Sequence, residues 1–149
     1  MIKIIFICHG NICRSPVAEI LAQKLIKENN LEDKISAYSR AVSNEEDGND
    51  IYPPMKKVLN THDIKFARHH ATKITTSEFN DADYIFYMDS SNYYYLNRLF
   101  GNNSKIKHIA SFYDGNDIED PWYTGRFELV FNQINECVKA IIEHYKSIC

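Results

Sequence analysis

A short apolar run that ends in a cysteine, directly before a helical pattern, most constrains how this chain folds. Residues Ile4–Ile7 are apolar and β-rich, and the run is too short for a helix, so it predicts a buried strand. Pro16 suits the first turn of a helix, where its missing N–H costs nothing. A buried strand that passes directly into a helix is typical of a parallel α/β sheet.

The loop between this strand and helix has the composition of an anion-binding site. Its backbone N–H groups lie at a helix N-terminus, free to surround an anion, and the planar fork of Arg14 can grip two phosphate oxygens. Among these donors the Cys8 thiol is expected to lose its proton readily, and the thiolate is a nucleophile. The alternative is that Cys8 is a small buried hydrophobe and Arg14 a surface residue. That alternative leaves the combination of strand, glycine, arginine and helix start unexplained.

Short apolar runs alternate with longer helical patterns along the rest of the chain. This alternation predicts one α/β domain over residues 1–149, with a four-stranded parallel sheet and helices on both faces. The predicted strands are 4–7, 35–39, 84–88 and 106–109, and the predicted helices are 16–29, 55–60, 92–100 and 127–145. Residues 40–54 are polar and turn-rich, so we expect a loop there. Sites in open α/β sheets lie at the carboxyl ends of strands, which places the Cys8 loop, Asp89 and Asp120 on one edge.

Composition excludes several classes of function. A net charge of −3 and the lack of a basic stripe disfavour nucleic acid as a partner. No stretch is long enough to cross a membrane, and the N-terminal run lacks the features of a signal peptide, so we expect a cytoplasmic protein without a membrane partner. Two of the four cysteines lie in the reactive loop and none shows metal-type spacing with histidines. A thiol that must stay reduced also favours a reducing compartment.

Two motifs near opposite ends of the chain resemble those of a known family. The sequence Cys-His-Gly-Asn-Ile-Cys-Arg-Ser-Pro at 8–16 and the sequence Asp-Pro-Trp-Tyr at 120–123 resemble the low-molecular-weight protein tyrosine phosphatases. The resemblance covers essentially all 149 residues. It implies hydrolysis of phosphotyrosine in proteins through a phosphocysteine intermediate, with no metal and no organic cofactor. It also implies binding of inorganic phosphate or inhibitory oxyanions, by a monomer or weak dimer.

The resemblance assigns roles to the catalytic residues. Cys8 attacks phosphorus, Asp120 protonates the leaving phenolate and later takes a proton from water, and Arg14 binds the phosphoryl oxygens. The phosphate-binding loop then comprises His9, Gly10, Asn11, Ile12, Cys13, Arg14 and Ser15. An isolated Asp-Pro is more commonly a turn initiator, but its pairing with the Cys8 loop favours the catalytic role.

Supporting roles follow from the resemblance, position by position. Asn11 matches an asparagine in a left-handed turn, a conformation that Asn tolerates. Ser15 matches the serine whose hydroxyl donates to the thiolate, and Ser39 matches a serine that supports the asparagine. Asp89 matches an aspartate after the third strand. His69 matches a buried histidine only with a one-residue shift, so His70 or a solvated loop are alternatives.

Cys13 lies five positions from Cys8 in one tight loop. Folding of the loop can bring the two sulfurs within disulfide reach, with Cys13 as a resolving thiol that protects Cys8 from over-oxidation. The family shows this behaviour. The alternative is a passive small residue at position 13, because access to the thiol decides its reactivity.

The wall of the expected substrate cleft departs from the family pattern. Glu45 stands where an aromatic residue is common, and Arg40 replaces a usual glycine. We therefore expect a cleft that lacks one aromatic wall and is lined by Asn44, Glu45, Trp122 and Tyr123. An acidic cluster at 45–47 would favour substrates with basic flanks, although a solvated loop is the simpler interpretation.

Three other functions are compatible with parts of the pattern. Arginine-phosphate phosphatases on the same scaffold carry threonine at the position of Ile12, and the aromatic pair at 122–123 suits a phenol better. Arsenate reductases share the reactive loop, but Cys137 and Cys149 do not match their cysteine relay. A catalytically silent phosphate-binding module would need neither Cys8 nor Asp120.

Overall fold

The computed structural model describes all 149 residues and contains a four-stranded sheet with the order β2-β1-β3-β4. Every neighbouring pair of strands is parallel. The four predicted strands are confirmed, with ends that differ by one or two residues. The strands are β1 (Ile2–Cys8), β2 (Ile35–Ala41), β3 (Tyr84–Tyr87) and β4 (Ile106–His108).

Six helices surround the sheet. The four predicted helices are present, with shifted ends. The expected loop at 40–54 is shorter than predicted, because β2 continues to Ala41 and α2 already begins at Pro53. The helices are α1 (Arg14–Glu28), α2 (Pro53–Thr61), α3 (Thr76–Asp81), α4 (Ser90–Phe100), α5 (Pro121–Thr124) and α6 (Phe127–Lys146).

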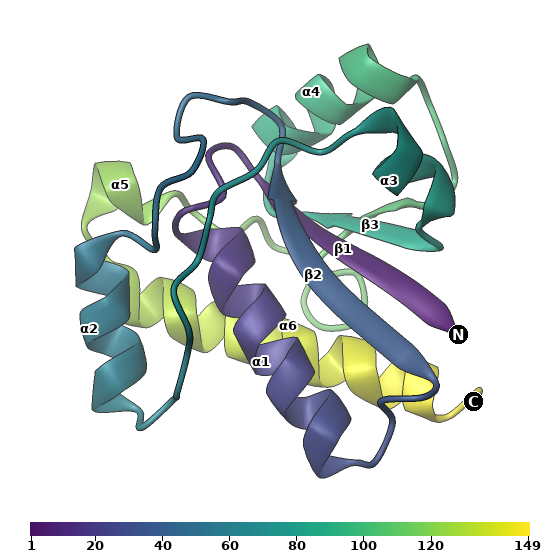
Figure 1. Ribbon diagram of the computed structural model, residues 1–149, viewed down its shortest axis with the longest axis horizontal. Coiled ribbons are helices and arrows are strands. Elements are labelled where there is room, and N and C mark those ends of the chain that lie inside the picture. Colours follow the sequence, from purple (N-terminus) through teal and green to yellow (C-terminus); the bar gives the residue numbers. More distant parts are fainter.

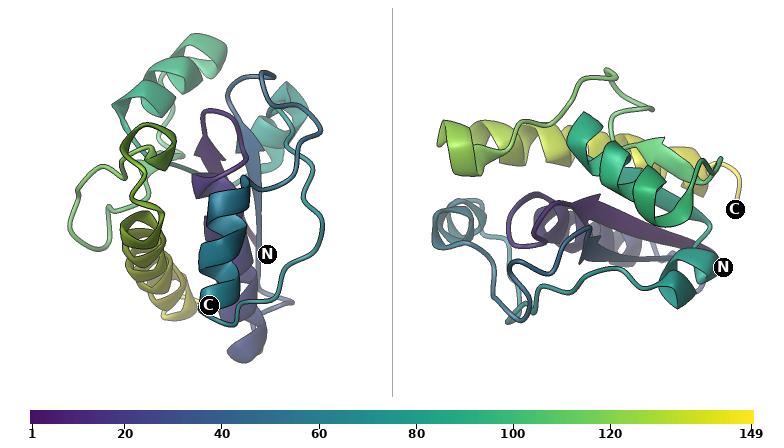
Figure 2. Two further views of the ribbon diagram at one scale, coloured as in Figure 1. Left: turned by 90° about the vertical axis from the view of Figure 1, so that its left-hand side faces the viewer. Right: turned by 90° about the horizontal axis from the view of Figure 1, so that it is seen from above.

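Strand β1 is buried on both faces of the sheet, which explains its unbroken apolar run. Ile4 and Phe6 belong to the larger core cluster, with residues of α1, α2 and α6. Ile5 and Ile7 belong to the second cluster, with residues of α3 and α4. The two groups of helices lie on opposite sides of the strands in Figure 1, and Figure 2 shows the same layers in two further views. The expected covering of both faces is therefore confirmed.

Two short helices were not predicted. Helix α3 starts with a capping box, in which Thr75 and Glu78 each bind the other's backbone N–H. The sequence Thr-Thr-Ser-Glu carries this signal, but the helix is only six residues long and its apolar pattern is weak. Helix α5 is a single turn after Asp120, and it ends at Gly125 in the left-handed conformation. None of the helices combines the length and the apolar character needed to span a membrane.

Candidate active site

Cys8 is the last residue of the central strand β1, and it lines a cavity. The backbone N–H of Asn11 donates to Cys8 Sγ at 3.3 Å, and Ser15 Oγ lies 2.9 Å from the same sulfur. Ser15 belongs to the first turn of α1, so the sulfur lies at the N-terminal end of that helix. Donors and the helix dipole both favour negative charge at this position.

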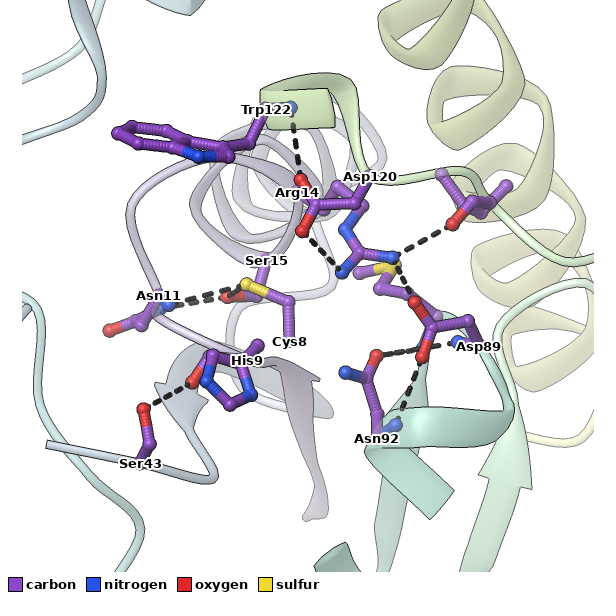
Figure 3. A network of polar contacts seen from close by, with 12 residues as sticks. Cys8, His9, Asn11, Arg14, Ser15, Ser43, Asp89, Asn92, Asp120 and Trp122 are labelled. Carbon is purple, nitrogen blue, oxygen red and sulfur yellow. Dashed lines mark hydrogen bonds and ion pairs between the residues drawn. The ribbon is translucent and has the colours of Figure 1, made fainter. Parts of the chain in front are cut away.

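Asn11 holds the reactive loop in shape. Its φ is 60°, in the left-handed region expected for it, and its side-chain Nδ2 donates to Ser15 Oγ at 2.8 Å and to Ser39 Oγ at 3.0 Å. Because Ser15 Oγ accepts this bond, the Ser15 hydroxyl is free to donate to Cys8 Sγ. Figure 3 shows the side chains of Ser15 and Cys8 next to each other. His69 Nε2 lies 2.6 Å from the Asn11 carbonyl oxygen, so the structure places His69, rather than His70, against the loop.

Glu19 extends this network and was missed in the sequence. Its Oε1 accepts the Ser39 backbone N–H at 2.8 Å and the Ser39 hydroxyl at 3.0 Å. Ser39 therefore gives its proton to Glu19 and accepts from Asn11. Glu19 lies one turn after Ser15 on α1, a spacing that could have indicated a shared face.

Arg14 is buried, and two hydrogen bonds hold its guanidinium. Only 2% of the residue is exposed, and its Nη1 donates to Asp89 Oδ2 at 2.6 Å and to the Ile118 carbonyl at 2.8 Å. Burial opposes the charge of Arg14, but Cys8 and Asp89 outweigh it and raise its pKa above the ordinary value. Asp89 is in turn the N-cap of α4, where its other oxygen accepts the Asn92 N–H. The guanidinium is thus permanently charged and oriented.

The buried polar residues of the protein gather at this site. Buried polar groups normally need hydrogen-bond partners, so a cluster of them indicates a hydrogen-bond network within the protein. All five lie in the reactive loop or next to the residues that support it: Asn11, Arg14, Ser15, Ser39 and Asn92.

Asp120 faces Arg14 from the segment that precedes α5. Its Oδ2 lies 3.6 Å from Arg14 Nη2, and its Oδ1 accepts the Trp122 N–H at 3.0 Å (Figure 3). The backbone at Asp120 is extended, as expected before Pro121. Its side chain is 30% exposed, so a group in the cavity can reach the carboxylate.

The cavity has a volume of about 200 Å³. Glu45, Trp122 and Tyr123 line it as expected, but Asn44 does not, and Asn44 is exposed on the turn that leads to Asp47. Tyr52 and Glu46 line the cavity and were missed; Tyr52 is the one aromatic residue in the loop expected at 40–54. The lining residues are Cys8, His9, Gly10, Ile12, Cys13, Arg14, Glu45, Glu46, Tyr52, Asp120, Trp122 and Tyr123.

Cys13 lines the same cavity but has a different environment from Cys8. Its burial, together with the nearby Cys8 and Asp120, raises the pKa of its thiol well above the ordinary value. Both cysteines are free thiols. A buried thiol with a raised pKa remains protonated at neutral pH, so Cys13 is poorly suited to be the nucleophile.

The fold and this site define a class: α/β proteins that carry a cysteine thiol and a loop of backbone N–H groups at the end of the first strand. The chain is similar to several known proteins of this class. YfkJ of Bacillus subtilis, a low-molecular-weight protein-tyrosine-phosphatase, is 36% identical over 135 residues, 87% of this chain and 86% of YfkJ. Its crystal structure superimposes with a TM-score of 0.93, covering 99% of this chain and 96% of the other.

Two further proteins show the same likeness. The low-molecular-weight phosphotyrosine protein phosphatase of Sus scrofa is 39% identical over 151 residues, covering 95% of this chain and 94% of its own. The structure of the Drosophila arginine phosphatase gives a TM-score of 0.86 at 30% identity, covering 97% of this chain and 98% of the other. The family model of low molecular weight phosphotyrosine protein phosphatases matches residues 3–147. The chain belongs to this family.

Proposed function

We propose that this protein hydrolyses phosphotyrosine in proteins through a phosphocysteine intermediate. The observation that supports this best is the convergence of three groups on one cavity: the Cys8 sulfur, the Arg14 guanidinium and the Asp120 carboxyl. A nucleophile, a phosphate clamp and a proton donor are what transfer of an aryl phosphate requires. In this proposal residues 1–149 act as one domain, as a monomer or weak dimer.

The first step transfers the phosphoryl group to the enzyme. The Cys8 thiolate attacks phosphorus, the P–S bond forms and the P–O bond to the phenol breaks. Arg14 and the backbone N–H groups of the loop bind the three oxygens on which charge spreads, and inorganic phosphate or other oxyanions would bind there as inhibitors. Asp120 gives its proton to the leaving phenolate, which departs as a phenol.

The second step regenerates the enzyme. Water attacks the phosphocysteine, Asp120 takes a proton from that water, and the P–S bond breaks. Inorganic phosphate leaves, and Cys8 returns as the thiolate beside Asn11 N–H and the Ser15 hydroxyl. Because the reaction needs a free thiol, we propose that the protein acts in a reducing compartment such as the cytoplasm.

The aromatic side chains around the cavity support a phenolic substrate. Tyr52, Trp122 and Tyr123 line one side of it, and a phosphorylated ring can pack against them. Phosphoarginine is the main competing substrate, since an arginine phosphatase shares the fold. Turnover of phosphotyrosine, phosphoserine and phosphoarginine should be compared side by side, and comparable rates on all three would contradict the proposed specificity. The Cys8→Ser variant should abolish turnover yet still bind phosphate.

Asp120→Ala tests the proton donor. If Asp120 protonates the leaving group, the variant should lose ~10²–10⁴-fold in phosphoryl transfer from phosphotyrosine, and far less from nitro-substituted aryl phosphates, whose phenolates leave unprotonated. The measurement is a leaving-group series on both proteins, under conditions that monitor the first step. A uniform loss across the series would mean that Asp120 only positions other groups.

A further inference from the structure

The ring of Tyr52 packs against two segments beside the cavity. The centroid of the ring lies 4.8 Å from that of Trp122, tilted by 47°, and 5.8 Å from that of Phe127, tilted by 34°. Tyr52 immediately precedes α2, Trp122 belongs to α5 and Phe127 begins α6. Figure 1 shows α5 beside the N-terminal end of α2. One side chain therefore packs against the segment that carries Asp120 and against the helix that follows it.

The backbone of Tyr52 is tied to the reactive loop. Its N–H donates to the Ile12 carbonyl at 2.8 Å, so the residue is connected to the loop that surrounds Cys8. The preceding Ile51 is buried, and Pro53 begins α2 with a fixed φ. The hydrogen bond to Ile12 and the start of α2 therefore fix the backbone of Tyr52 relative to the reactive loop.

The segment that carries Asp120 has little other packing on its cavity side. Trp122 is 55% exposed and Tyr123 is 84% exposed. The Asp120 carboxylate accepts its hydrogen bond from the backbone N–H of Trp122, so the position of the acid follows that of Trp122. In Figure 3 the Trp122 ring extends from this backbone over the reactive loop. The Tyr52 ring is the aromatic surface on which Trp122 rests.

We propose that Tyr52 is a positioning residue for the proton donor. Its ring holds Trp122, and thereby Asp120, where the carboxyl can reach the leaving oxygen of the substrate. It also supplies aromatic surface in a cleft whose wall carries the exposed Glu45 instead of an aromatic residue. The proposal rests on the proposed function, because it concerns the acid of that reaction.

The test combines Tyr52 variants with a leaving-group comparison. Tyr52→Leu removes the ring. We expect the rate of phosphoryl transfer from phosphotyrosine to fall roughly three- to tenfold, which corresponds to the interaction energy of one aromatic pair. Transfer from a nitro-substituted aryl phosphate should change little, because it needs no acid. Tyr52→Phe keeps the ring and should restore the rate, which also separates the ring from the hydroxyl. In an Asp120→Ala background Tyr52→Leu should have no further effect, since the two residues act through one proton transfer.

The outcomes distinguish this inference from the proposed function. An equal loss on both substrates, or an additive loss in the double variant, would overturn the role of Tyr52 while leaving the reaction in place. Retention of phosphotyrosine turnover by Cys8→Ser would instead contradict the proposed function. Thermal unfolding and the affinity for inorganic phosphate verify that each variant is folded. If Tyr52→Leu fails to fold, Tyr52→Met keeps apolar bulk without the ring. The same rate changes on the two substrates are expected for Tyr52→Met.

Discussion

At the scale of single residues, the two cysteines of the reactive loop differ in what surrounds their sulfurs. Both sulfurs are buried, but Cys8 receives the Asn11 N–H and lies next to the Ser15 hydroxyl, whereas the pKa of Cys13 is raised. The same loop therefore presents one sulfur suited to attack and one that remains a thiol. This difference should control how the pair responds to oxidation.

We expect mild peroxide to convert Cys8 to a sulfenic acid, which Cys13 then attacks, forming the disulfide and releasing water. Because only the Cys13 thiolate attacks and its pKa is raised, the disulfide should form faster as pH increases. The oxidation is run at about pH 6.5 and at about pH 8.5, and samples are quenched at successive times. Mass spectrometry of these samples measures the rate of disulfide formation. Cys13→Ser should instead be inactivated irreversibly. A rate that does not depend on pH, or equal recovery of both proteins by thiols, would contradict a resolving role.

Arg14→Lys tests the geometry of the phosphate clamp. Lysine retains the charge but lacks the planar fork, and it cannot satisfy Asp89 and the Ile118 carbonyl while binding two phosphoryl oxygens. We expect kcat/KM for phosphotyrosine to fall by about 10²–10³-fold. The matched control is Arg98→Lys on the exposed surface of α4, which should behave like the unmodified protein. Unchanged efficiency in Arg14→Lys would restrict Arg14 to a structural role.

At the scale of elements, the loop between β2 and α2 is held by Asp50. Its Oδ1 accepts the N–H groups of Ile51 at 2.7 Å and His69 at 3.0 Å, and its Oδ2 pairs with Lys56 at 2.5 Å. Burial opposes the charge, but the bonds from Lys56, His69 and Ile51 outweigh it and hold the pKa of this carboxyl well below its usual range. Asp50 therefore joins the Tyr52 loop, α2 and the segment that carries His69.

Asp50→Asn should lower the free energy of unfolding by about 1–3 kcal/mol near neutral pH, because it removes charge-assisted hydrogen bonds. A carboxyl whose folded pKa is depressed stabilises the protein fully above its unfolded pKa. It loses that effect progressively as pH falls below the unfolded pKa and through the lower folded pKa. The difference between the two proteins should therefore shrink between about pH 7 and about pH 3. Urea unfolding at both pH values measures it. A difference that is constant with pH would show that the charge of Asp50 contributes nothing.

At the scale of the whole molecule, the parallel sheet assembles the site from distant parts of the chain. The order β2-β1-β3-β4 brings the ends of β1 and β3 together, so Arg14 meets Asp89 from 75 positions away and the Ile118 carbonyl from 104. Because the site exists only in the folded chain, a ligand of the site stabilises the whole fold.

Inorganic phosphate should therefore raise the melting temperature. At a phosphate concentration of about 100 times Kd the expected stabilisation is ~2.7 kcal/mol. Cys8→Ser should retain the shift, since the anion is bound by the loop N–H groups and by Arg14, whereas Arg14→Lys should lose most of it. Thermal unfolding across a phosphate titration measures this, with chloride at the same ionic strength as the control. Equal shifts in all three proteins would mean that phosphate binds elsewhere.

The features that the sequence determined by itself are those that depend on neighbouring residues. The strand, loop and helix around Cys8, the extended backbone before Pro121 and the apolar face of α6 all follow from local pattern, because period, helix start and proline geometry are read within a few residues. The family motifs at 8–16 and 120–123 are equally local. The catalytic candidates could therefore be named before their arrangement was known.

Only the tertiary structure decided which distant side chains support them. His69 rather than His70 reaches the Asn11 carbonyl because of the path of a segment with no periodic pattern. Tyr52 lines the cavity because the end of its loop packs against Trp122 of α5. Asn44 does not line the cavity because it lies on a turn exposed to solvent. Such contacts depend on how elements pack across the sheet, and no window of sequence contains both partners.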